Sequence, residues 1–245
     1  MPDVNPDLSA KSRPTRRERV RAATQAELTA AARKLLVQAG TDAVSLRAIA
    51  AELGMTAPAI YRYFGSREDL LNALVDELYD ELASYLLDVR ESYRDGTLSQ
   101  RFLFTSRAFR VWALEHRAEF GLLFGAPIPG VGTSHSPDPA EDRGHRFGQV
   151  WLELFIELAA VASPTPRWRR PISRQLRAEI NGYIDRIGQP VSVDLALLFL
   201  SCWERLYGAV CTEVFGHLHF ALEDASALFE DQLDEAAERL GIPDR

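Results

Sequence analysis

Several classes of protein are made improbable by what this 245-residue chain lacks. It has only two cysteines, Cys202 and Cys211. They lie nine residues apart within an apolar helical pattern, and at about 100° per residue this spacing puts them on opposite faces of a helix. We therefore expect no disulfide between them, which fits a reducing cytoplasm. The first residues are polar and proline-rich where a secretory signal would be apolar, so secretion is not expected.

The sequence also lacks the signatures of membrane proteins and of the common enzyme classes. The longest apolar run, VDLALLFLSCW from Val193, meets Glu204 and Arg205. It is too short to cross a bilayer, so we interpret it as part of a buried helix and expect no membrane association. The patterns G-x-x-x-x-G-K-[ST], G-x-G-x-x-G, G-x-S-x-G and H-E-x-x-H are all absent. We therefore expect neither an enzyme nor a bound cofactor.

One loop gathers residue types that can ligate metals. They are His135, Asp138, Glu141, Asp142 and His145. Pro137 and Pro139 lie among them and break the helix that would set a ligand spacing, so a solvated loop is the favoured interpretation. We predict no metal site.

Basic residues are fewer than acidic residues overall, but they are concentrated near one end of the chain. The net charge is -7, which by itself argues against a nucleic-acid-binding protein. Between Lys11 and Arg67, however, there are 11 basic and 4 acidic residues, which leaves 17 basic and 31 acidic residues for the rest. This division predicts a basic nucleic-acid-binding head on an acidic body, although a solvated helix face is the alternative.

Helical periodicity runs through nearly the whole chain, and no convincing strand pattern is present. Thr15 with Glu18 forms a capping box, Ser45, Thr56 and Ser66 are candidate N-caps, and Gly40 ends the first helix. We predict helices over residues 15–40, 45–54, 56–65, 66–94, 97–116, 117–124, 143–162, 171–187, 192–218 and 223–240. The predicted fold class is all-α.

The helices divide into three regions. Residues 1–14 have little to bury and are predicted to be a flexible arm. Residues 15–65 form a three-helix domain, and residues 66–245 form a larger helical domain. In the first, a two-turn helix, a turn at Gly54 and another short helix give a helix-turn-helix arrangement. The side chains expected to pack it together are Leu46, Ile49, Ala50, Leu53, Met55, Ile60 and Phe64.

The segment SLRAIAAELGMTAPAIYRYFGSREDLL, preceded by AARKLLVQAG, resembles the N-terminal domain of the TetR family of bacterial transcriptional regulators. The match runs from about Arg17 to Leu74. It implies an all-α homodimer in which a three-helix head binds a double-stranded DNA operator. It also implies a fourth helix that links the head to a divergent body, which binds a small-molecule effector and supplies the dimer interface.

The resemblance assigns DNA contacts to individual positions. Ser45 and Arg47 would contact phosphate or groove, Thr56, Ala57 and Ala59 would face bases, and Tyr61, Tyr63 and Arg67 would contact phosphate. Arg62 can read a guanine by a bidentate contact, although contact with a phosphate is equally open. Tyr63 stands where many relatives have His, and Gly65 where many have Lys, so the resemblance implies one phosphate contact fewer than in those relatives. Arg13 and other basic residues of the arm are a further candidate contact, in the minor groove.

The larger domain is rich in aromatic residues at helical spacing. Such residues form a core more often than a ligand pocket, but as a group they favour an apolar or aromatic effector. The candidate ligand-binding residues are Phe109, Trp112, His116, Phe120, Phe124, Trp151, Phe155, Trp203 and Tyr207. The stretch LFLSCWERLYGAVCTEVFGHL also resembles a tryptophan-containing helix in one subgroup of TetR-like bodies. Helices 171–187 and 192–218 are expected to form a four-helix dimer interface, with a pairing that includes the last helix as the alternative.

The sequence thus predicts a cytoplasmic, homodimeric, ligand-responsive regulator that represses transcription from a palindromic operator. Activation instead of repression stays open. Two other classes remain as alternatives. One is a helical enzyme or metal-binding protein that retains a helix-turn-helix, and the other is a structural DNA-binding protein without an effector.

Overall fold

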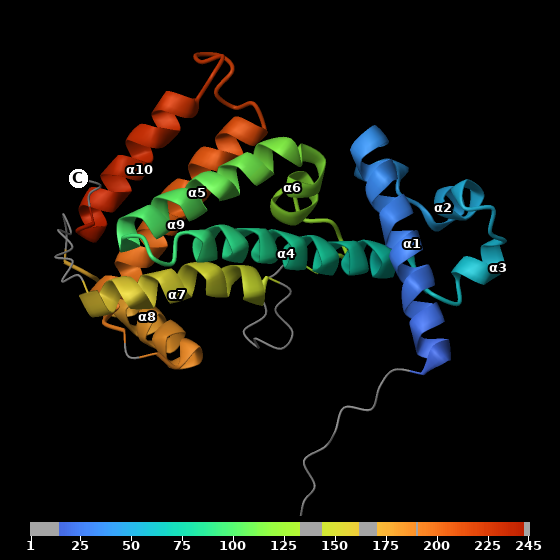
Figure 1. Ribbon diagram of the computed structural model, residues 1–245, viewed down its shortest axis with the longest axis horizontal. Coiled ribbons are helices and arrows are strands. Elements are labelled where there is room, and N and C mark those ends of the chain that lie inside the picture. Colours follow the sequence, from blue (N-terminus) through green and yellow to red (C-terminus); the bar gives the residue numbers. More distant parts are fainter. Residues whose placement is uncertain (1–14, 133–143, 162–170, 190, 243–245) are drawn as a thin grey trace, which may run out of the picture. The chain divides into compact units, whose positions relative to one another are not determined.

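A computed structural model describes residues 15–132, 144–161, 171–189 and 191–242 (Figure 1). Within these residues the regular structure is entirely helical, as the sequence predicted. The chain divides into two compact units, Met1–Leu71 and Asn72–Arg245. The division falls inside helix α4, Arg67–Ser92.

The first unit consists of short helices that begin at polar caps. Its elements are α1 (Arg16–Ala39), the 3-10 helix η1 (Thr41–Ala43), α2 (Leu46–Glu52), α3 (Ala57–Ile60) and the start of α4. The predicted capping box is confirmed, because Glu18 N–H donates to the Thr15 hydroxyl and the Glu18 carboxylate accepts from Thr15 N–H. Gly40 ends α1 with a φ of +79°, a conformation that favours glycine. These local signals fix where the helices of the unit start and stop.

Two expectations for this unit are wrong. The third helix does not reach Gly65, because α3 ends at Ile60 and residues 61–63 form a tight turn. Phe64 N–H still donates to the Ile60 carbonyl, so the chain winds onward without continuing the regular helix. Leu53, expected to pack inside, is 38% exposed because it caps the C-terminus of α2, whereas Ile49 and Ile60 are fully buried. Thr56 precedes α3 without a side-chain capping bond.

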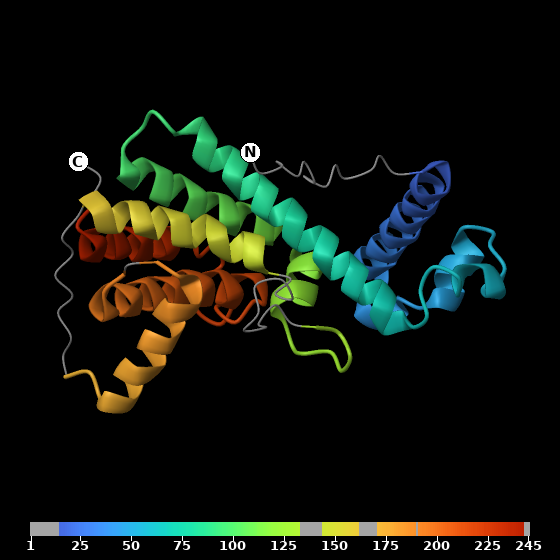
Figure 2. The same cartoon turned by 90° about the horizontal axis from the view of Figure 1, so that it is seen from below.

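The second unit is a layered helical bundle (Figures 1 and 2). After α4 its elements are α5 (Leu98–Glu115), α6 (Arg117–Phe124), α7 (His145–Val161), α8 (Arg174–Ile187), α9 (Val193–Val214) and α10 (Ser226–Leu240). Helix α5 packs against α6, α7, α9 and α10, and α8 packs on α9. Arg146 of α7 pairs with Asp80 of α4 at 2.8 Å, and Arg90 of α4 pairs with Glu153 of α7 at 2.6 Å. Helix α5 is therefore the central element of this unit.

Two of the long helices end earlier than predicted. Helix α4 ends at Ser92, two residues before Arg94. Helix α9 ends at Val214 instead of residue 218, since Gly216 adopts a φ of +71° that leaves the helix. Several helices of this unit have a hydroxyl side chain at the N-cap. Each hydroxyl accepts a hydrogen bond from the backbone N–H three residues further along the chain, as at Thr97, Ser173 and Ser192.

Helix α9 is longer than its apolar run suggested. At 22 residues it has the length and composition of a membrane-spanning helix, so the expectation that this segment is too short is wrong. The helix nevertheless carries Glu204, Arg205 and Glu213, and one side packs on α5, α8 and α10. One side of α9 is therefore buried within the bundle.

The loop considered for metal binding cannot be compared with the structure in full. His135, Asp138, Glu141 and Asp142 lie outside the described residues, and the side chain of His145 is not described. In the part of the chain that is described, no group of three or more potential ligands lies together.

Candidate nucleic-acid interface and apolar cavity

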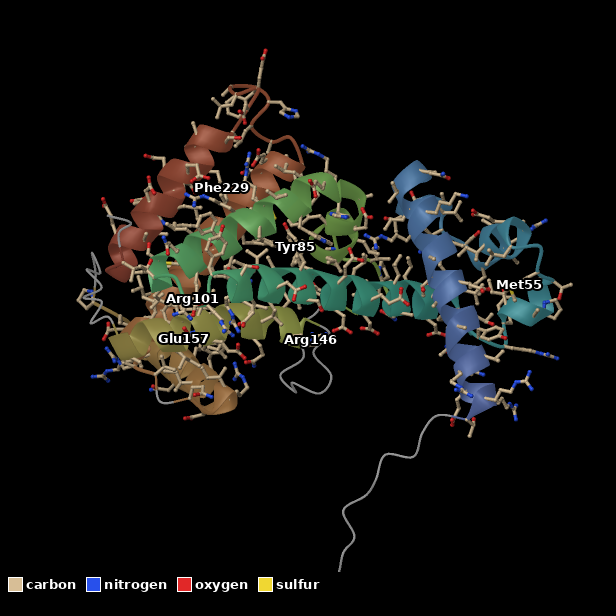
Figure 3. All side chains as sticks on the ribbon, viewed as in Figure 1. Met55, Tyr85, Arg101, Arg146, Glu157 and Phe229 are labelled. Atoms are coloured by element: carbon tan, nitrogen blue, oxygen red, sulfur yellow. The ribbon has the colours of Figure 1, made fainter. Side chains whose placement is uncertain are left out.

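The turn between α2 and α3 holds these two helices against each other. Gly54 has a φ of +64°, in the left-handed region that side chains disfavour. Met55, labelled in Figure 3, donates its N–H to the Ala50 carbonyl at 2.8 Å. The Ser45 hydroxyl caps α2 by accepting from Ala48 N–H at 3.2 Å. The resulting geometry is that of a helix-turn-helix.

Most side chains predicted to contact DNA are exposed, in or near α3. Arg47, Thr56, Ala57, Tyr61 and Arg62 are exposed, while Ser45, Ala59, Tyr63 and Arg67 are partly buried. Tyr61 is 59% exposed, and it follows α3 directly, so its hydroxyl is available to a ligand. Neither Arg47 nor Arg62 forms an ion pair with any residue that the structure describes. Three of the predicted residues, Tyr61, Arg62 and Tyr63, belong to the turn after α3 and not to the helix.

Tyr63 is oriented by a contact from the first helix. The guanidinium of Arg21 lies 5.7 Å from the centroid of the Tyr63 ring, within the range of a cation–π interaction. Arg16, Arg17 and Arg19 are exposed on the first turn of α1. Arg13 and the other arm residues before 15 lie outside the described residues. The N-terminal part of α1 thus carries the basic charge that the sequence concentrates here.

Arg67 has a structural contact that the sequence did not reveal. Its Nε donates to the Val44 carbonyl and its Nη2 to the Thr41 carbonyl, both at 2.7 Å. Val44 is fully buried, and Ser45 directly after it caps α2. The guanidinium therefore ties the start of α4 to the segment that precedes α2. Its predicted phosphate contact stays a prediction, because the acceptors now seen are backbone carbonyls.

The second unit contains one continuous cluster of aromatic rings around Phe109 of α5. Phe109 is fully buried, and its centroid lies 5.6 to 6.1 Å from those of five other rings. These are the rings of Phe120, Phe124, Phe147, Trp151 and Trp203. The rings come from α5, α6, α7 and α9, so this cluster is the core that joins those helices.

A cavity lies beside this cluster, between α5, α7, α9 and α10. Of the nine side chains predicted to bind a ligand, Trp151, Phe155 and Trp203 line it. The other lining side chains, which the sequence analysis missed, are Phe102, Leu154, Leu158, Phe199, Cys202, Leu206 and Leu240. Helical periodicity shows which faces are buried but not where packing leaves a space, so no sequence signal distinguished them.

The remaining predicted ligand residues take part in packing. Phe109, Trp112 and Phe120 are buried in the core. His116 stacks on Trp112, with 4.8 Å between ring centroids, and its Nδ1 lies 3.0 Å from the Trp112 carbonyl oxygen. None of these contacts excludes a ligand role, which stays a prediction.

The C-terminal end of α6 is held from two other helices. The hydroxyl of Tyr79 on α4 donates to the Leu123 carbonyl at 3.2 Å, and that of Tyr207 on α9 donates to the Phe124 carbonyl at 3.1 Å. Burial raises the pKa of Tyr207, so its hydroxyl stays a neutral donor. These are the last carbonyls of the helix, which have no partner within it. Predicted as a ligand residue, Tyr207 therefore also has a structural role.

A second polar contact joins α5 to α9 and α10. Arg110 forms a bidentate pair with Glu213, with Nε–Oε2 and Nη2–Oε1 distances of 2.6 and 2.5 Å. Its Nη2 also donates to the Ser226 hydroxyl at 2.8 Å, and its guanidinium lies 5.2 Å from the ring of Phe229, labelled in Figure 3. The side chains of Arg110 and Glu213 are 15% and 13% exposed, so the pair is largely shielded from water.

Comparison with known proteins agrees with both units. The family model "Bacterial regulatory proteins, tetR family" matches residues 28–74. The model "Tetracyclin repressor-like, C-terminal domain" matches residues 104–236, more than half of the chain. The chain is 29% identical over 219 residues to the HTH-type transcriptional regulators Rv1816 of Mycobacterium tuberculosis and Mb1846 of Mycobacterium bovis. This alignment covers 89% of the chain and 92% of each relative.

Solved structures show the same fold. SCO4313, described as a regulatory protein, is 27% identical with a TM-score of 0.70, and the match covers 91% of this chain and 100% of that one. A protein of unknown function from Rhodococcus sp. RHA1 is 21% identical with a TM-score of 0.61, over 90% and 95% of the two chains. The predicted family and all-α fold are confirmed, and the family is one of regulators, not enzymes. The chain therefore belongs to the TetR family and is a DNA-binding helix-turn-helix transcriptional regulator.

Proposed function

We propose that the protein is a repressor that binds a palindromic operator as a homodimer and is released by a small apolar or aromatic effector. Residues 15–65 read the DNA, with the arm 1–14 as an added contact. Residues 66–245 bind the effector and form the dimer, and the protein acts in the cytoplasm. The observation that carries the effector part is the cavity between α5, α7, α9 and α10, which is lined by aromatic and aliphatic side chains.

The DNA part of the proposal is supported by the exposed side chains of the head. Arg47 and Arg62 are exposed without ion pairs to described residues, and Tyr61, directly before Arg62 in the sequence, is also exposed. Small side chains at Ala57 and Ala59 let the backbone of α3 approach base edges. Arg62 is the candidate base-reading residue, and the other residues set the register of the head on the phosphates.

The dimer part of the proposal is supported by helices α8 and α9 of the body, which carry apolar side chains that the chain itself does not cover. Helix α8 has a strongly apolar face, yet among its residues only Ile180 is buried, and Leu176 is 40% exposed. On α9, Leu197 and Leu200 are also partly exposed. A second copy that covers these faces with its own α8 and α9 forms an isologous four-helix interface. Two heads in such a dimer meet half-sites about one helical turn, roughly 34–36 Å, apart.

Release follows if the effector favours a dimer whose heads no longer match successive major grooves. An effective release needs the ligand to prefer that state by on the order of 10²-fold. The mechanism is a shift between two populations, because a ligand of equal affinity for both states changes nothing.

The experiment that tests the proposal is selection of bound duplexes from a random DNA library. We expect an enriched palindrome whose affinity falls steeply as salt concentration rises. Arg62→Ala is then expected to relax the preference at one position per half-site, whereas Tyr61→Phe weakens binding to all sequences alike. An enriched site without two-fold symmetry would overturn the dimeric operator, and no enriched site would leave only a non-specific DNA-binding protein.

A further inference from the structure

Arg21 lies on the side of α1 that leads into the core of the head. Leu28 is seven residues further along the helix, so the two side chains share a face, and Leu28 is fully buried. Thr24 and Gln25, one turn after Arg21, are partly buried, whereas Arg21 itself is exposed. The face of α1 that packs on the core therefore becomes accessible to solvent at Arg21.

Tyr63 is the aromatic residue that this arginine contacts. The Arg21 guanidinium carbon lies 5.7 Å from the centroid of the Tyr63 ring. In Figure 1 the chain after α3 turns back toward the N-terminal half of α1. The backbone of Tyr63 is fixed to the core, because its N–H donates to the carbonyl of the fully buried Ile60 at 2.9 Å. The cation–π contact then holds the ring against α1.

The hydrogen-bond donors of Arg21 are not used within the head. Its side chain forms no ion pair or hydrogen bond with any residue that the structure describes. A guanidinium presents five N–H donors, and it can lie over a ring while these donors bind a phosphate. The contact with Tyr63 therefore leaves Arg21 able to bind an anion.

The turn after α3 supplies a hydrogen-bond donor at this place but little charge. The Tyr63 hydroxyl can donate to a phosphate oxygen without neutralising it. Gly65 has no side chain, so Arg62 is the only cation between Tyr61 and Ser66. Arg21 adds a positive charge beside Tyr63 from a different helix. Arginine and tyrosine side chains are both common partners of DNA phosphates.

We propose that Arg21 and Tyr63 bind one phosphate of the DNA backbone together. Tyr63 donates its hydroxyl, and Arg21 supplies the charge and holds the Tyr63 ring in place. The inference rests on the proposed function, because it takes the phosphate to belong to the operator. It goes further by extending the contact surface of the head to α1 and by assigning one phosphate to a pair of residues.

The test measures the affinity of the full-length protein for the selected operator as the salt concentration is varied. Each phosphate that a protein cation neutralises adds about 0.9 to the magnitude of the slope of log K against log salt. Arg21→Gln should therefore reduce the slope by about 0.9 for each head that binds. Its loss of affinity should be about twofold greater per head at roughly 0.1 M than at roughly 0.2 M salt. Arg21→Lys keeps the charge and should keep the slope.

Tyr63→Phe separates the two members of the pair. This variant keeps the ring for Arg21 but lacks the hydroxyl, so it should weaken binding by a constant factor at every salt concentration and keep the slope. The losses in Arg21→Gln and Tyr63→Phe should not add, because the two side chains share one phosphate. The double variant should therefore bind more tightly than the product of the two single losses predicts.

Arg19→Gln is the matched control. Arg19 is exposed on the same helix, and a spacing of two residues puts it about 200° around the helix axis from Arg21. Its replacement should leave the slope unchanged. The proposal is overturned if Arg21→Gln keeps the slope, if Arg19→Gln reduces the slope as much, or if the losses in Arg21→Gln and Tyr63→Phe add fully.

Failure of this inference and failure of the proposed function give different results. Phosphate contacts do not depend on the DNA sequence, so the slope can also be measured with a duplex of mixed sequence. If no palindrome is selected but Arg21→Gln reduces the slope on that duplex, the phosphate contact stands and the palindromic operator fails. If a palindrome is selected and Arg21→Gln keeps the slope on it, the operator stands and the phosphate contact fails.

Discussion

Replacement of Arg67 separates two roles for a residue at the start of α4. The structure gives its guanidinium two hydrogen bonds, to the carbonyls of Val44 and Thr41, each 2.7 Å long. A hydrogen bond that involves a charged group contributes about 1.5–3 kcal/mol, and partial exposure of Arg67 favours the lower end. Arg67→Ala should therefore reduce the free energy of unfolding of the head by about 2–3 kcal/mol. Arg67→Lys can restore at most one of the bonds and should lose about half as much.

The same variants should weaken operator binding without changing its salt dependence. Each phosphate neutralised by a protein cation adds about 0.9 to the slope of log K against log salt. A residue that positions α2 through Val44 and Thr41 contributes nothing to that slope. We therefore expect Arg67→Ala and Arg67→Lys to reduce affinity at every salt concentration by a constant factor, measured by fluorescence anisotropy with a labelled operator.

Arg47→Ala is the control, since Arg47 is exposed and has no ion pair with described residues. Its replacement should lower the slope by about one if it contacts phosphate. The positioning role is refuted if Arg67→Lys binds like the unaltered protein while Arg67→Ala lowers the slope by about one. That pair of results would assign Arg67 to a phosphate.

Two further predictions concern the body. Arg110→Ala should lower the free energy of unfolding, measured in urea, by about 3–5 kcal/mol, because it leaves the shielded carboxylate of Glu213 without its countercharge. The double variant Arg110→Ala, Glu213→Ala should recover part of this loss. Equal losses in the single and the double variant would refute this reasoning. Burial raises the pKa of the Cys202 thiol to about 11 from an ordinary value of 9.0. The stability that comes from burying the neutral thiol should therefore be present up to about pH 9 and be lost as the pH rises toward 11. Comparison with Cys202→Ala over this range measures the effect, and parallel pH profiles of the two proteins would contradict it.

Signals that act over three or four residues were predicted well from the sequence. The capping box at Thr15, the cap at Ser45 and the stop at Gly40 all have the expected role, because a side chain and the backbone it bonds lie within one turn. The predicted end of α3 was wrong for a related reason. The buried pair Ile60 and Phe64 has helical spacing, but the backbone of residues 61–63 tightens into a turn that side-chain periodicity does not encode.

Contacts between distant segments could not be predicted in the same way. The acceptors of Arg67 are backbone carbonyls 23 and 26 residues earlier, and a carbonyl has no sequence signature. The lining of the cavity could not be predicted from the sequence for the same reason. Periodicity identified Trp151 and Phe155 as buried, but whether a buried side chain faces a neighbour or a space depends on how four helices meet.

The shortness of α3 limits how much sequence information one head can extract from DNA. Its four residues, Ala57–Ile60, include two alanines and a proline, so the helix itself offers no side chain that makes paired hydrogen bonds to a base. Arg62 follows in the turn as the nearest such group. A mismatched base pair costs a DNA-binding protein about 1–3 kcal/mol, while a genome presents roughly 10⁶ or more competing positions. A single head that distinguishes so few base pairs cannot select one specific site among these positions. Two heads that bind together square the ratio of specific to non-specific affinity of one head.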